Sequence, residues 1–193
     1  MSLPLIVNLP HDMVVFRRVN SGVRCYNMPH PDFISSNSRF FENLLEHCFL
    51  FDLGRHLVLA EEPRLLNVLK SEVDAYGFDF VLSVAYRSLH VQMKTRSGSP
   101  PSNQYKLSEA LWKLPNACAI WMLYEQATLE PSSYFVLGFP MPPIAGFMAS
   151  SKSGYRSVRM RQANHHRLSL GELAELLFPR YAAPNNSFNR SAS

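Results

Sequence analysis

The run at 117–124, Ala-Cys-Ala-Ile-Trp-Met-Leu-Tyr, restricts the fold more than any other feature, because every residue in it is apolar. The run is too short to be a membrane helix, which needs roughly 18 to 20 such residues. A strand with one face in water alternates polar and apolar residues, whereas a continuous apolar run is typical of a strand covered on both faces. We therefore expect this strand to lie inside a layered structure.

The segments around this run predict an α/β sandwich with a mixed sheet. Ser36-Asn37-Ser38 supplies N-cap chemistry, and apolar residues then recur at helical spacing as far as about Leu53. The other expected elements are, in order, a strand at 55–60, a helix from Pro63 through Leu69 that exits at Tyr76-Gly77, a β-hairpin at 78–94, a loop at 95–104, a helix at 105–114, strands at 117–124, 133–139 and 157–161, and an amphipathic helix at 169–178.

The chain has 193 residues, enough for one domain with a true core. We expect an α/β domain at 38–180, an extended arm or edge hairpin at 1–37 with a strand at 13–16, and a disordered polar tail at 181–193. No secretion signal and no membrane segment is recognised, so the expected location is the cytoplasm.

The three cysteines, Cys25, Cys48 and Cys118, are widely spaced and form no Cys-x-x-Cys pair. This spacing indicates neither a disulfide framework nor a cysteine-based zinc site. We expect them to be buried thiols.

The predicted hairpin places an acid beside a lysine. Asp79 lies near the start of its first strand, and Gln92-Met93-Lys94 ends its second. Because side chains on a strand alternate between its faces, Gln92 and Lys94 share a face, and a turn near Tyr86 to Ser88 brings Lys94 next to Asp79, directly or diagonally.

These residue types suit hydrolysis of a phosphodiester with help from Mg²⁺ or Mn²⁺. Mg²⁺ takes hard oxygen ligands and keeps several waters, so one or two carboxylates and a carbonyl are enough. Asp79 is the expected central ligand, with the Gln92 amide oxygen and the Met93 backbone carbonyl as further ligands. Lys94 would offset negative charge at the scissile phosphate.

A third carboxylate is expected from the first helix, where Glu42 and Glu46 lie four residues apart on one face. We choose Glu42 because it lies near the helix start, from which a site at the strand ends can be reached. The Glu46 side chain can equally well point to solvent. Glu72 and Asp74 are the other acids in range.

The segments 72–82 and 90–97, which hold Asp79 and Gln92-Met93-Lys94, resemble the core of the PD-(D/E)xK nuclease superfamily, in the subset with Gln in place of the second acid. The resemblance implies a restriction-endonuclease-like three-layer sandwich with a central mixed sheet flanked by helices. It also implies Mg²⁺-dependent cleavage of DNA, with site residues at Asp79, Gln92 and Lys94 and a helix glutamate at Glu42. The sequence departs from the family pattern in having no Pro before Asp79.

The formal charge of +4 suits a polyanionic partner such as DNA. Arg96, Lys106 and Lys113 follow Lys94 along the chain and are the expected nucleic-acid contacts. A second basic stretch, from Lys152 to Arg167, is either a phosphate-binding surface or a solvated face.

Three other interpretations stay open. Asp79 and Lys94 can be a solvated surface pair, which contributes only about 0 to 1 kcal/mol. The chain can be a weak or inactive member of the fold that binds nucleic acid or protein. It can also be a structural partner that pairs through the apolar segment 140–147, and a homodimer is compatible with any of these.

Overall fold

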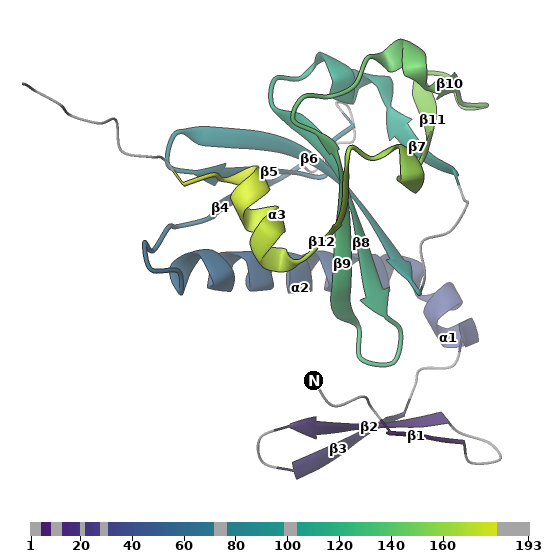
Figure 1. Cartoon of the computed structure of the whole chain (residues 1–193). Coiled ribbons are helices and arrows are strands. Elements are labelled where there is room, and N and C mark those ends of the chain that lie inside the picture. Colours follow the sequence, from purple (N-terminus) through teal and green to yellow (C-terminus); the bar gives the residue numbers. More distant parts are fainter. Residues whose placement is uncertain are drawn as a thin grey trace, which may run out of the picture.

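The computed structural model describes residues 5–8, 13–19, 22–27, 31–71, 77–98 and 104–180. Its largest element is a six-stranded sheet with the order β12-β9-β8-β6-β5-β4 (Figure 1). β6 and β8 are parallel and the other neighbours are antiparallel, which confirms a mixed sheet. The strands are β4 (Asn67–Lys70), β5 (Phe80–Val84), β6 (Arg87–Ser97), β8 (Ala117–Glu125), β9 (Glu130–Gly138) and β12 (His165–Leu168).

β8 lies inside this sheet and is buried on both faces, as its apolar run predicts. Cys118, Ile120 and Met122 pack into the core on one face of the sheet, and Ala119 and Trp121 pack into a second core on the other face. The sheet is therefore the middle of three layers.

Helix α2 (Ser38–Val58) covers the first face (Figure 1). Its buried side chains, spaced four residues apart, are Phe41, Leu45, Phe49, Leu53 and Leu57. The predicted helix is confirmed, but it is longer than expected and the predicted strand at 55–60 is wrong. The reason is that Leu57 continues the apolar stripe on the sheet by one more turn.

The predicted helix at 63–69 is also wrong, because β4 occupies its second half and pairs with β5. Leu65 and Leu69 are 75% and 70% exposed, so their spacing does not mark a buried helix face. The edge of β5 offers unpaired backbone groups, and extended backbone satisfies them where a helix would not. The expected helix end at Tyr76 lies outside the described residues.

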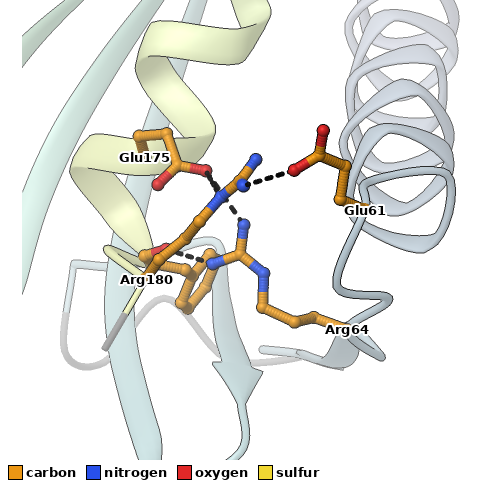
Figure 2. A network of polar contacts seen from close by, with 5 residues as sticks. Glu61, Arg64, Glu175 and Arg180 are labelled. Atoms are coloured by element: carbon orange, nitrogen blue, oxygen red, sulfur yellow. Dashed lines mark hydrogen bonds and ion pairs between the residues drawn. The ribbon is translucent and has the colours of Figure 1, made fainter. Parts of the chain in front are cut away.

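Helix α3 (Leu170–Leu177) is the predicted amphipathic helix, and it packs on the same face as α2. Ser169 caps it, and hydrogen bonds from the Ser169 backbone and hydroxyl lower the pKa of Glu172. Figure 2 shows how its C-terminal end is held: Arg64 donates to the Phe178 carbonyl and to Glu175, 3.1 Å away. Arg180 also contacts Glu175, at 3.2 Å.

The second face is covered by a small sheet instead of a helix. Residues 105–114, expected to be helical, form β7 (Gln104–Ser108) and a short 3-10 helix, η1 (Glu109–Lys113). β7 pairs with β11 (Tyr155–Arg159), which pairs with β10 (Met148–Ala149). Leu107 and Val158 fill the core beneath this sheet, so strand pairing to β11 replaces the helical turn that local spacing favours. The expected α/β fold with a mixed sheet is therefore present, with α2 and α3 on one face and a small sheet with a 3-10 helix on the other.

The remaining described elements are short. β1 (Leu5–Asn8), β2 (Met13–Val19) and β3 (Gly22–Asn27) form an antiparallel sheet, and α1 (Pro31–Ser36) precedes α2. Two more 3-10 helices are η2 (Ile144–Gly146) and η3 (Met160–Gln162). Within the expected loop at 95–104, β6 continues to Ser97 and 99–103 lies outside the described residues, as do Glu72, Asp74 and the tail from residue 181.

The two cysteines with described side chains differ in their surroundings. Cys118 is buried as expected, and burial raises its pKa to about 12. Cys48 is only half-buried. None of the described helices is long and apolar enough to cross a membrane.

Gly138 is expected to be required for packing of β9 against β8. A Cβ at this position would lie 2.6 Å from the Cys118 Cβ, which is closer than two non-bonded carbon atoms can approach. Gly138→Ala should lower the free energy of unfolding by about 1 to 3 kcal/mol, as measured by urea denaturation. Gly146→Ala is the matched control, because its added Cβ would meet no atom within 4 Å. Equal stability of the two variants would contradict the packing described here.

Candidate active site

The predicted hairpin exists, and its two strands differ in length. Pairing of β5 with β6 runs from Val84–Arg87 to Phe80–Val91, and Ala85 takes a positive φ of 52° in the turn. β6 continues to Ser97 while still paired with β8 on its other side. No described strand pairs with this last part of β6 on the side of β5, so an edge is left open there.

A cavity of about 310 Å³ lies at this open edge. It is lined by residues of α2, β6 and β7 and by the residue before β5, namely Glu42, Glu46, Asp79, Met93, Lys94, Thr95 and Tyr105. Four residues predicted for the site, Glu42, Asp79, Met93 and Lys94, therefore meet around one space although they are up to 52 positions apart in the sequence.

Asp79 is held by three hydrogen bonds to other described residues. Its backbone N–H donates to the Val91 carbonyl at 2.8 Å, and its carbonyl accepts from the Ser71 N–H at 2.9 Å. Its carboxylate oxygen Oδ2 accepts from the Met93 N–H at 2.6 Å. The carboxylate thus takes the place of a missing strand partner for Met93, just before β5 begins.

The Met93 backbone faces the same edge. The N–H and C=O of one strand residue point to the same side of the strand, and the Met93 N–H points to Asp79. Its carbonyl is therefore directed to the open edge as well, as a backbone oxygen ligand requires.

Lys94 supplies the positive charge of the cavity. None of the described residues forms a hydrogen bond or an ion pair with its ammonium group, and the register places Lys94 opposite Trp121 of β8. Asp79 and Lys94 were predicted to be neighbours, and in the structure both line the same cavity.

Glu42 and Glu46 reach the cavity from successive turns of α2. Glu46 forms an ion pair with Lys70 of β4 at 2.8 Å and is 17% exposed, so solvent is not its main surrounding. The Glu42 carboxylate lies near Tyr124: burial raises the pKa of Tyr124, a hydrogen bond with Ser97 opposes the rise, and the negative charge of Glu42 adds to it.

Gln92 does not line the cavity. It is 4% exposed, and its amide oxygen has no hydrogen-bond partner within the described structure. Leu89, Val91 and Met93 face the core under α2, so strand alternation directs Gln92 to the opposite face. The structure therefore does not bring Gln92 to the position of a second metal ligand.

Tyr105 is a lining residue that the sequence did not reveal, because residues 105–114 were expected to form a helix. Its ring packs edge-on against Trp121 with 5.7 Å between the ring centres. The Tyr105 hydroxyl and the Trp121 indole N–H are buried without a partner in the described part of the chain, as is the Gln92 oxygen. Most buried polar groups in proteins have a hydrogen-bond partner, so three such groups without one on the same face of the sheet are unusual.

The three expected nucleic-acid contacts do not line the cavity. Arg96 lies near the end of β6, Lys113 is exposed at the end of η1, and Lys106 is exposed on β7, with its ammonium 3.5 Å from the Ser151 hydroxyl. In the second basic stretch, Arg156 is paired with Glu109 at 2.8 Å.

The donor set has the chemistry that Mg²⁺ prefers, with carboxylates on three positions and a backbone carbonyl. Within the described ranges, however, no three His, Cys, Asp or Glu side chains lie close enough together to hold a metal ion. Mg²⁺ retains several waters and needs only one or two carboxylates, so Glu42, Asp79 and the Met93 carbonyl are the groups of this lining that could hold it.

No protein-family model matches this sequence, and comparisons with curated proteins and with solved structures likewise give no match.

Asp79 is expected to stabilise the fold as well as to line the site. Asp79→Ala leaves the Met93 N–H without its acceptor, which should lower the free energy of unfolding by about 1 to 3 kcal/mol. Asp79→Asn keeps an oxygen acceptor and should retain most of the stability. Urea denaturation of both variants tests this, and an equal loss in the two would show that the carboxylate charge, and not the hydrogen bond, stabilises the hairpin.

Proposed function

We propose that this cavity hydrolyses phosphodiester bonds of DNA with the help of Mg²⁺ or Mn²⁺. The observation that carries the proposal is the meeting of Glu42, Asp79 and Lys94 at the open edge of β6. Carboxylates and a lysine that is unpaired among the described residues surround a single space, which suits a reaction that needs both a cation and charge stabilisation of a phosphate.

In this proposal the fold is the restriction-endonuclease-like sandwich. The long helix α2, the β5-β6 hairpin and the interior strand β8 follow one another as expected, and β8 lies parallel to β6. The order differs at two places, because β4 and the β7-η1 segment stand where helices were expected. A small sheet also covers the second face.

The two sides of the cavity have different tasks. Glu42, Asp79 and the Met93 carbonyl would hold the divalent cation, which supplies a more acidic bound water and neutralises phosphate charge. Asp79 is kept in position by its bond to the Met93 N–H. The Lys94 ammonium binds a phosphate oxygen and offsets the negative charge that develops during attack, and no internal ion pair in the described chain has to be broken first.

Glu46 is expected to tune the site, since its carboxylate is neutralised by Lys70. This ion pair limits the number of negative charges that face an incoming phosphate. Glu46 is therefore assigned no direct ligand role.

A second candidate is a chain of this fold that binds DNA without cutting it. The position of Gln92 favours it, because the residue expected to be the second ligand is buried away from the cavity. With fewer ligands, cation binding is weaker.

The test is cleavage of plasmid DNA with Mg²⁺ or Mn²⁺. Asp79→Asn, Glu42→Gln and Lys94→Met should each reduce the rate by about a hundredfold or more, because each removes a charge that stabilises the transition state. Glu62→Gln, which changes an exposed glutamate outside the cavity, is the control and should cut like the wild type.

Wild-type protein that binds the DNA but leaves it intact with either cation would support the second candidate. Equal cleavage by all variants would show that the activity does not reside in this cavity.

A further inference from the structure

The small sheet has an outer face that is turned away from the core. Tyr105, Leu107 and Val158 point inward, as their packing shows. Since side chains alternate along a strand, their neighbours point outward, and the register pairs these neighbours across the two strands. The outer face, as we define it, consists of Gln104 and Lys106 of β7 and Tyr155, Ser157 and Arg159 of β11, with Lys152 of the preceding turn.

The charge of this outer face is entirely positive. The Lys152 ammonium lies 4.2 Å above the Tyr155 ring, and Lys106 reaches only a hydroxyl. No described carboxylate forms an ion pair with Lys106, Lys152 or Arg159. The strands β7, β10 and β11 and the turn at 150–154 contain no acidic residue.

The acid that follows β7 in the chain, Glu109, is paired on the inward side. Glu109 is bound by Arg156 at 2.8 Å, and Arg156 also approaches the Phe147 carbonyl at 3.3 Å. Arg156 lies across from Leu107 in the register and is therefore on the inward side of β11. One strand thus carries two arginines with different surroundings: Arg156 is compensated within the fold and Arg159 is not.

The outer face adjoins the cavity. Tyr105 lines the cavity, and its two chain neighbours, Gln104 and Lys106, point to the outer face. Adjacent Cα atoms are about 3.8 Å apart, so the outer face begins one residue away from the cavity lining.

We propose that the outer face binds the sugar-phosphate backbone of double-stranded DNA next to the phosphodiester held in the cavity. This inference rests on the proposed function and extends it from the site to the substrate path. Lys106, Lys152 and Arg159 contact phosphates, and Tyr155 supports the Lys152 stem. The large exposed apolar side chain on β10 is Met148 alone, so the face lacks the apolar area by which amphipathic surfaces enter a membrane.

The test measures binding of a short double-stranded oligonucleotide at several salt concentrations. All proteins carry Asp79→Asn, so that bound DNA stays uncut. Adding Lys106→Gln and Arg159→Gln together should weaken binding at least about tenfold and reduce the slope of log affinity against log salt by about two, one for each lost phosphate contact. The stability to urea should not change.

Two matched controls complete the design. Arg55→Gln changes an exposed arginine on α2, on the opposite side of the main sheet, and should leave the affinity and the salt slope unchanged. Arg156→Gln breaks the ion pair with Glu109 and should lower stability while the salt slope stays the same.

An unchanged slope in the Lys106→Gln/Arg159→Gln protein would overturn the docking surface, whether or not the wild type cuts DNA. Binding that follows the predicted slopes, together with wild-type protein that does not cut, would support the surface and refute the nuclease. A parent protein with no affinity for the oligonucleotide, or with affinity for anionic vesicles only, would overturn the docking surface, and cleavage by the wild type would then decide on the nuclease alone.

Discussion

The difference in length between β5 and β6 is the constraint on which the site depends. β5 begins only at Phe80, which pairs with Val91, whereas β6 runs on to Ser97 because β8 continues to pair with it in parallel. Backbone groups at the unpaired side of β6 need partners. The Asp79 carboxylate provides one by accepting the Met93 N–H, and the same arrangement leaves an open edge for a cavity.

The layers on the two faces of the sheet divide the charges around that cavity. α2 brings carboxylates from one face, because Glu42 and Glu46 flank the apolar stripe that packs on the sheet. β6 and β7 bring Lys94 and Tyr105 from the other face. Glu46 is paired with Lys70 of the neighbouring β4, and the Lys94 ammonium has no ion-pair partner among the described residues.

Elements whose own sequence pattern demands burial were predicted well. β8 is apolar throughout, α2 and α3 have regular apolar stripes, and the hairpin has two β-rich runs around a turn. The errors at 55–60, 63–69 and 105–114 fall where short apolar spacings are compatible with either a helix or a strand. At these positions tertiary contacts determine the secondary structure. α2 is longer because its last turn packs on the core, and β4 and β7 form because neighbouring strand edges need hydrogen-bond partners.

The sequence by itself determined the interior strand, the long helix, the hairpin and the proximity of Asp79 to Lys94, because each follows from local periodicity and a short turn. Tertiary structure alone decided that Glu46 faces the cavity, that Tyr105 lines it and that Gln92 does not. It also decided which arginine of β11 faces inward. These outcomes depend on where β5 begins and on which layer covers each face of the sheet, and both are set by pairing between strands that are distant in the chain.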